Sequence, residues 1–229
     1  MEKQDTIQSL GDVSIFEMLN EKALEEIIDR SQIVSFKKDD VIIFESDSTN
    51  VVYIILEGVI KISRTNEEMK EVILAFLSEK DFFGEMSVLD GAVRSADATA
   101  FSKVKLLKIE GNIFLELLET FPKISIALMR ELVSRLRKTD HQIKSISLED
   151  AVGKVASVII RLANDVGRLK KGRVEIDNFA SQQEMANFAA TSRETISRVL
   201  SSFERDGLIE RDMNKIMIVN FEEFKGRFT

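Results

Sequence analysis

Two charged residues, Glu85 and Arg94, lie close together in residues 82–100, FFGEMSVLDGAVRSADATA. A Glu carboxylate accepts hydrogen bonds from hydroxyl groups, and the planar guanidinium of an Arg can hold two phosphate oxygens at once. Gly84 directly precedes the Glu, and a backbone that must approach a ligand closely favours a residue without a Cβ atom. These three residues predict a site for a sugar phosphate. The alternative is a surface turn whose charged side chains are solvated.

The segment resembles the phosphate-binding cassette of cyclic-nucleotide-binding domains. That cassette reads Phe-Gly-Glu, a small or apolar residue, Leu, a short turn, and then Arg with a small residue. The resemblance implies that Glu85 binds the ribose 2′-hydroxyl and that Arg94 binds the phosphate of a cyclic nucleotide. It adds Gly84, Met86 and Ser95 to the ligand-binding residues.

Short runs rich in Val, Ile, Phe and Tyr surround this segment, separated by Asp, Ser, Asn and Gly. Such runs predict an all-β barrel or jelly roll. Gly58 interrupts one run, which indicates a bulge or a close approach of the backbone, and in the nucleotide-binding family a Gly here lines the pocket. Ser46 and Lys80 stand where many family members have Gly at turns. A positive φ at either residue would cost about 1 kcal/mol.

The composition excludes several kinds of site. The 229 residues include no Cys and one His, His141, so disulfides, cysteine-ligated zinc and iron–sulfur clusters are excluded, and a histidine-built metal or haem site is not expected. No metal and no cofactor is expected, apart from a possible cyclic-nucleotide effector. No segment approaches the roughly 20 apolar residues of a membrane span, so we expect a cytoplasmic protein without membrane contact.

The charge is unevenly distributed. The formal net charge is −7 at pH 7, but residues 151–229 hold 13 Lys and Arg against 11 Asp and Glu. The C-terminal third is therefore mildly basic, and the first 150 residues carry the acidic excess. This distribution weakly favours contact of the C-terminal part with nucleic acid.

A long helix is predicted to begin directly after Pro122, since Pro is favoured at a helix start. Apolar residues then recur at alternating spacings of three and four, which favours a parallel coiled coil between two copies of the chain. The alternative is one amphipathic helix packed on its own domain. The predicted seam comprises Met129, Leu132, Leu136, Thr139, Ile143 and Ile146.

Two polar residues of this helix are candidate base contacts. In the cyclic-AMP receptor proteins a Thr on this helix binds the adenine amino group, and Thr139 matches it. The next residue, a Ser in those proteins, is Asp140 here. A carboxylate accepts from an adenine amino group or from the N–H edge of guanine, so the identity of the base is open.

The segment SQQEMANFAATSRETISRVLSSFERDGLIE predicts a helix-turn-helix. Ser181 and Glu184 have the spacing of a capping box, and Ser192 is placed to cap a second helix over residues 193–205. Two short helices joined by a tight turn are typical of DNA-binding proteins, whose second helix enters the major groove. After Gly207 the chain predicts a β-hairpin wing.

The start of the second helix carries the candidate base-reading residues. Arg binds guanine bidentately, Glu accepts from cytosine, and Ser adapts to either. The alternative is a solvated polar face with ion pairs. The predicted DNA-binding residues are Ser181, Gln182, Ser192, Arg193, Glu194, Ser197 and Arg198.

The segment SRETISR and the order of the parts resemble the CRP/FNR family of bacterial transcription regulators. The resemblance implies an α+β chain with a cyclic-nucleotide-binding β-roll (jelly roll) over 1–122, a dimerisation helix and hinge over 123–150, and a winged helix-turn-helix over 151–229. It implies a homodimer that binds a pseudo-palindromic double-stranded DNA site under control of cAMP, with RNA polymerase as a further partner, and no enzyme activity.

Two alternatives stay open. The same fold could act without ligand or respond to another effector, such as a cyclic dinucleotide. A protein of another class, a nucleotide-binding regulatory module, would use its helix-turn-helix to contact protein only.

Overall fold

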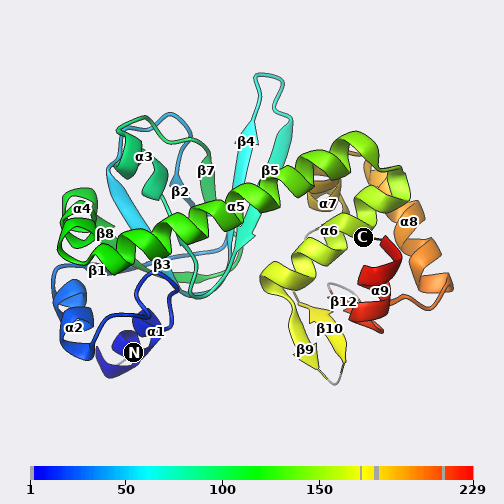
Figure 1. Cartoon of the computed structure of the whole chain (residues 1–229). Helices are drawn as coiled ribbons and strands as arrows, with labels where there is room; N and C mark the ends of the chain where they lie inside the picture. Colours follow the sequence, from blue (N-terminus) through cyan, green and yellow to red (C-terminus); the bar gives the residue numbers. More distant parts are fainter. Residues whose placement is uncertain (1–2, 171, 178–180, 213–214, 229) are drawn as a thin grey trace. The chain divides into compact units, whose positions relative to one another are not determined.

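The computed structural model describes residues 3–170, 172–177, 181–212 and 215–228, and it divides into two compact units. The first unit comprises residues 1–64 and 77–137, and the second comprises residues 65–76 and 138–229. The domains expected from the sequence are each one continuous segment of the chain. The compact units are not continuous, because residues 65–76 group with the C-terminal part. Figure 1 labels most of the elements of both units.

The predicted β-roll is confirmed as two four-stranded sheets with the orders β1-β8-β3-β6 and β2-β7-β4-β5. Apolar residues of both sheets form a shared core around Ile43, Ile60, Phe83 and Leu106. The strands are β1 (Gln32–Phe36), β2 (Val41–Ile43), β3 (Val51–Glu57), β4 (Ile60–Thr65), β5 (Glu71–Leu77), β6 (Phe82–Phe83), β7 (Asp97–Ala100) and β8 (Val104–Glu110).

Helices α1 (Lys3–Gly11) and α2 (Glu21–Asp29) precede these strands, α3 (Glu85–Asp90) lies between β6 and β7, and α4 (Gly111–Thr120) follows β8. The hydrophobic periodicity around residues 15–31 predicts one helix there, but residues 15–19 form turns, and α2 begins only after Asn20, whose side chain accepts a hydrogen bond from the Ala23 N–H. The polar N-terminus gave no helix prediction, yet α1 buries Ile7 and Leu10 in a second core with α2, β3, β8 and the start of α5.

The long helix α5 (Pro122–Leu148) begins at the chain's only Pro, as expected. One residue of the predicted coiled-coil seam, Leu132, packs against the core of the first unit. The exposed large apolar residues of α5 are Ile126, Met129, Val133, Leu136, Ile143 and Leu148. All except Leu148 lie at positions that fit alternating spacings of three and four. Among the described helices, α5 included, we find none long and apolar enough to cross a membrane.

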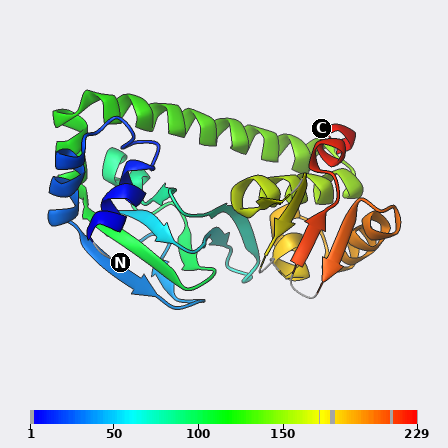
Figure 2. The ribbon, with the colours of Figure 1, turned by 90° about the horizontal axis from the view of Figure 1, so that it is seen from below.

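The second unit holds the predicted helix-turn-helix and a four-stranded sheet of order β11-β12-β10-β9, whose strands lie side by side in Figure 2. The sequence after Gly167 predicts a basic connector and then a short strand around residues 174–179; in the structure β10 lies at that strand, and residues 168–170 of the connector form a further strand, β9, paired with it. The elements are α6 (Ala151–Val166), β9 (Arg168–Lys170), β10 (Arg173–Ile176), α7 (Gln182–Ala189), α8 (Arg193–Arg205), β11 (Ile209–Asp212), β12 (Lys215–Ile218) and α9 (Phe221–Phe228). The wing is β11–β12, and its turn at residues 213–214 lies outside the described residues.

Several turn predictions can be checked directly. Ser46 and Lys80 have φ angles of 71° and 75°, so both non-Gly residues adopt the strained left-handed conformation. The sequence had left open whether these turns take this conformation or a different shape. Gly58 has φ 93°, and a Cβ there would lie 2.4 Å from the Lys103 carbonyl oxygen, which confirms a close approach of the backbone. The backbone of Gly58 lies against residues 102–104 of the same protein.

Candidate functional site

The cassette around Gly84 is built by the loop between β6 and α3. Gly84 has φ 85°, and a Cβ there would lie 2.7 Å from the Val51 carbonyl oxygen and 2.9 Å from Nη1 of Arg94. A side chain is therefore excluded at this position both by conformation and by space. The sequence predicted this requirement, and the groups that impose it in the structure are parts of the protein itself.

Arg94 is buried, with 3% of its surface exposed. Its Nε donates to the Thr49 hydroxyl (2.9 Å), Nη1 donates to the Gly84 carbonyl (2.6 Å) and the Ser87 hydroxyl (2.7 Å), and Nη2 donates to the Val51 carbonyl (2.8 Å). A guanidinium has five N–H groups, so this geometry leaves one for a ligand. The bidentate phosphate contact expected from the sequence would need two. Burial lowers the pKa of Arg94.

Glu85 is also buried, with 3% of its surface exposed. Nη1 of Arg135, from α5, lies 3.2 Å from its Oε1. Burial raises the pKa of Glu85 above its ordinary value, although the charges of Arg135 and Arg94 and a hydrogen bond from its own backbone oppose that shift. A carboxylate withdrawn from water in this way is characteristic of a binding site more than of a structural surface turn.

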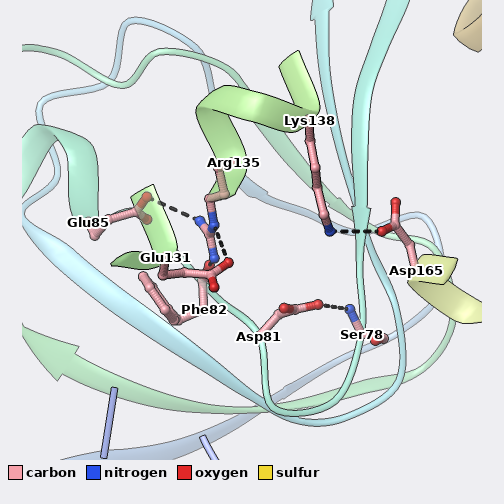
Figure 3. A network of polar contacts seen from close by, with 8 residues as sticks. All are labelled: Ser78, Asp81, Phe82, Glu85, Glu131, Arg135, Lys138 and Asp165. Atoms are coloured by element: carbon pink, nitrogen blue, oxygen red, sulfur yellow. Dashed lines mark hydrogen bonds and ion pairs between the residues drawn. The ribbon is translucent and has the colours of Figure 1, made fainter. Parts of the chain in front are cut away.

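Arg135 was not predicted as a site residue. Figure 3 shows its side chain between Glu85 and Glu131, with Phe82 beside it. It donates to Oε1 of Glu131 (3.2 Å) and to the Phe82 carbonyl (2.9 Å), and its guanidinium carbon lies 4.4 Å from the centre of the Phe82 ring. The contact between Arg135 and Glu85 joins residues 50 positions apart in the sequence, so no local pattern could have indicated it.

The other predicted ligand residues fall in three places. Ser95 is exposed, and its hydroxyl lies 3.7 Å from the sulfur of Met86, which is 53% exposed. These two residues therefore lie together at the surface of the cassette. Gly58 lies in the turn between β3 and β4, against Ser102 and Lys103. Thr139 and Asp140 are exposed on α5 and belong to the second unit.

The helix-turn-helix has the local structure that the sequence predicted. The Ser181 hydroxyl accepts from the Glu184 N–H (3.2 Å), and the Glu184 carboxylate accepts from the Ser181 N–H (2.7 Å), which completes the capping box. Ser192 caps α8 by accepting from the Thr195 N–H (3.2 Å). Ala190 takes the left-handed turn position with φ 50°.

One face of α8 is buried and the other presents the predicted base-reading residues. Ile196, Val199, Leu200 and Phe203 are buried. Arg193, Glu194 and Arg198 are exposed, Ser197 is half-exposed, and all four lie in the first two turns of α8. This is the part of a recognition helix that reaches base edges. The cap residue Ser192 and the α7 start, Ser181 and Gln182, are also at the surface.

The hairpin β9–β10 is less basic than its sequence indicates. Glu175 forms ion pairs with Lys170 and with Lys215, the latter at 2.9 Å. Their hydrogen bonds hold the pKa of the Glu175 carboxyl at about 2. The positive charges of this hairpin are therefore partly neutralised by ion pairs within the sheet.

Both halves of the chain match domain models of known protein families. Residues 33–121 match the model of the cyclic nucleotide-binding domain, and residues 153–227 match the model of the Crp-like helix-turn-helix domain. A cyclic AMP receptor protein of Thermus thermophilus is 32% identical over 168 residues, 73% of this chain and 74% of that protein. The chain belongs to the CRP/FNR family of transcription regulators.

Other members of the CRP/FNR family are similar over nearly the whole chain. A CRP-like cAMP-activated global transcriptional regulator of Mycobacterium tuberculosis is 27% identical over 218 residues, which cover 95% of this chain and 97% of that protein. A solved structure of a CooA mutant from Carboxydothermus hydrogenoformans has a TM-score of 0.77 at 20% identity and covers 96% of this chain and 98% of its own. At that identity the likeness shows the fold alone.

Membership of the CRP/FNR family decides between the classes that the sequence left open. The family consists of DNA-binding transcription regulators, a non-enzymatic class. The helix-turn-helix is therefore a DNA-binding module, and the alternative of a module that contacts protein only is not supported. The predicted α+β fold with a β-roll, a long helix and a C-terminal helix-turn-helix is confirmed.

Proposed function

We propose that this regulator is a homodimer whose affinity for a pseudo-palindromic DNA site is set by a cyclic nucleotide, cAMP, bound at the cassette. The observation that carries the proposal is the burial of Glu85 beside Arg94. Keeping a carboxylate in a buried position costs free energy, and a ligand hydroxyl that donates to it gives a reason for that cost. The names of two similar proteins, which refer to cyclic AMP, support the choice of nucleotide.

In the proposed complex, Glu85 accepts from the ribose hydroxyl. The phosphate lies next to the positive charge of Arg94 and takes its one remaining N–H together with the hydroxyl of Ser95. Most of the Arg94 hydrogen bonds hold the cassette in shape instead. The cassette is in this way built before the ligand arrives, which lowers the cost of binding.

Arg135 gives the cassette a direct connection to α5. Its guanidinium shares Glu85 with any ligand that donates to the same carboxylate. A ligand at Glu85 therefore changes the contacts of α5, and such a difference in contacts is what allows a ligand to shift a conformational equilibrium.

The proposed dimer is formed by the exposed face of α5. Residues 126, 129, 133, 136, 140 and 143 alternate at spacings of three and four, and all except Asp140 are apolar. A parallel pair of helices buries such a seam. Asp140 then lies in the seam itself, where two copies bring like charges together, and Thr139 lies beside the seam.

Asp140→Leu tests this register. The substitution removes the paired charges and adds apolar surface, and polar residues at seam positions reduce coiled-coil stability. We therefore expect the dissociation constant of the dimer to fall at least about tenfold. The control is Ser134→Leu, an exposed position of α5 outside the seam. Sedimentation equilibrium measures both dissociation constants. Equal tightening in both variants would mean that the seam lies elsewhere.

A dimer would place the two copies of α8 in successive major grooves, roughly 34 Å apart. Arg198 and Glu194 would read a G·C pair in each half-site. RNA polymerase is the further partner that we propose for a regulator bound at such a site.

The decisive experiment is a fluorescence-anisotropy titration of a labelled palindrome with TGTGA-type half-sites, at fixed salt, with and without cAMP. Salt is fixed because phosphate contacts make affinity strongly salt-dependent. We expect cAMP to tighten binding at least about tenfold, the usual size of allosteric coupling, and Glu85→Gln to remove that response. Equal affinity with and without cAMP would leave DNA binding intact and favour ligand-independent action or another effector, such as a cyclic dinucleotide.

The DNA-binding half has its own control. Arg198→Ala should weaken binding by about 1–3 kcal/mol, the usual value of a bidentate base contact. Arg205→Ala changes an equally exposed cation in the last turn of α8, and we expect a much smaller effect on affinity.

A further inference from the structure

Residues 65–76, which we call the arm, belong structurally to the C-terminal part of the chain although they lie within the β-roll sequence. The arm runs from the end of β4 through most of β5, the hairpin labelled in Figure 1. Its turn is organised by Asn66, whose side-chain oxygen accepts from the N–H groups of Glu68 (3.1 Å) and Lys70 (2.9 Å).

The arm contributes an aromatic ring to the core of the second unit. Phe76 is 2% exposed, and its ring contacts Phe188 of α7 edge to face, with the ring centres 5.6 Å apart. Such edge-to-face pairs add to the stabilisation that burial itself provides. The first helix of the helix-turn-helix is therefore packed partly against β5.

Arg161 of α6 contacts both the arm and α7. Its Nη2 donates to the Leu74 carbonyl of the arm (2.9 Å), and its guanidinium carbon lies 4.0 Å from the centre of the Phe188 ring. Burial lowers the pKa of Arg161 to about 10, so the side chain stays cationic at neutral pH. Arg161 is half-buried, and the aromatic face and the carbonyl together restrict the position of its guanidinium.

A polar contact fixes a second point along α7. Asn187 donates from Nδ2 to Oε2 of Glu71 (3.1 Å), and its Oδ1 accepts from Gln183 (3.0 Å). The arm thus holds α7 through both an apolar contact and a directional hydrogen bond. Because Asn187 and Phe188 are neighbours in α7, these contacts hold one side of the helix against the arm.

We propose that the arm positions the helix-turn-helix for DNA and that Arg161 is the positioning residue that clamps it. The turn from Ala190 to Ser192 is short and capped, so the placement of α7 determines that of α8.

The test compares Arg161→Met with Lys70→Met in the full chain. Both variants remove one cation, but Lys70 pairs only locally with Glu68, and both of these side chains are exposed. Hydrogen exchange of the α7 amides, residues 185–189, is measured without nucleotide. We expect exchange to be about tenfold faster in Arg161→Met, as for a locally loosened element, and unchanged in Lys70→Met.

DNA affinity at fixed salt is the second readout, because a purely structural role would leave it unchanged. We expect Arg161→Met to change the dissociation constant by about fivefold or more, as residues that couple two sites do. Weaker binding means that the clamp holds α8 in its DNA-binding position, and tighter binding means that it holds α8 away from it. Unchanged α7 exchange, or faster exchange with unchanged DNA affinity, would overturn the proposal.

If Arg161→Met does not fold, Glu71→Ala replaces it. That substitution removes the arm's hydrogen bond to Asn187 and leaves Arg161 in place, and we expect exchange and affinity to change in the same sense by about two- to threefold. Neither readout uses cAMP. A wrong effector assignment therefore leaves this test intact, whereas loss of the Arg198→Ala effect would indicate that α8 does not bind DNA.

Discussion

Replacing Arg94 by Met should destabilise the β-roll before any ligand is considered. The guanidinium donates four hydrogen bonds to protein oxygens, and the residue is 3% exposed. Met fills a similar volume but donates none of these bonds. The carbonyl groups of Gly84 and Val51 then lose their buried donor.

The magnitude follows from the cost of unsatisfied buried groups. Each buried acceptor left without a donor costs about 1–3 kcal/mol, and removing one partner from a buried charged network typically costs about 3–5 kcal/mol. The contributions are not additive, so we expect the free energy of unfolding to fall by about 4 kcal/mol. In a protein of this size that loss lowers the melting temperature by roughly 10 °C.

The chain provides its own reporter for this measurement. Tyr53 is its single Tyr and no Trp is present, and its ring stacks on Phe83 with the centres 5.1 Å apart. Urea unfolding followed by tyrosine fluorescence, without nucleotide, therefore monitors the β-roll.

Arg64→Met is the matched control. Arg64 is an exposed Arg whose ion pair with Glu45 should contribute less than about 1 kcal/mol. A wild-type transition midpoint in Arg94→Met would refute the structural role of the guanidinium. If the loss is found, Glu85→Gln is the better variant for testing ligand binding.

Three further changes test other parts of the structure. Burial raises the pKa of Glu85 above 4.5, so the folded state binds a proton more tightly than the unfolded state; the stability of wild type relative to Glu85→Gln should fall as pH rises from about 4.5 through the folded-state pKa, measured by urea unfolding at several pH values. Ser46→Gly should stabilise the β-roll by up to about 1 kcal/mol, because Ser46 has φ 71°; a lower melting temperature would contradict this. Phe224→Ala should cost about 3–5 kcal/mol in thermal unfolding, because Phe224 is 1% exposed and packs on Phe203 of α8; substitution of the exposed Glu222 by Ala should change the transition very little.

The helix-turn-helix could be predicted in detail because its signals are local. The capping box of Ser181 and Glu184 and the cap at Ser192 each act across three residues, and the structure has both. The buried face of α8 follows from helical spacing alone. The strained turn at Lys80 was only half predictable: the sequence marked the position as a turn, but it left open whether Lys80 would take a positive φ or the turn would have another shape.

Long-range contacts were beyond the reach of such patterns. Arg135 meets Glu85 across 50 residues, and Arg161 meets Leu74 across 87. Neither Arg belongs to a motif with a recognisable spacing. The seam predicted on α5 has the same difficulty: spacings of three and four fit two neighbouring faces of a helix, and it is the packing of Leu132 against the core of the first unit that favours the other face in the proposed dimer.

Gly167 follows the end of α6, a position where Gly is often favoured because it adopts the left-handed conformation. Its φ is −75°, however, outside the left-handed region. A Cβ at this position would lie 2.3 Å from the Ala163 carbonyl and 2.6 Å from a methyl group of Val174. Space, and not backbone conformation, therefore requires the Gly.

The arm bears on how such regulators can be recombined. The matches to a nucleotide-binding model and to a helix-turn-helix model fall on separate stretches of the chain, which invites exchange of the two halves between relatives. A graft of residues 151–229 alone would leave the partners of Phe188 and Arg161 behind in the donor. Chimeras should keep their solubility and their response only when the donor's residues 65–76 are transferred together with its C-terminal half. The unit that must be transferred for DNA recognition is therefore made of two segments that are separate in the sequence.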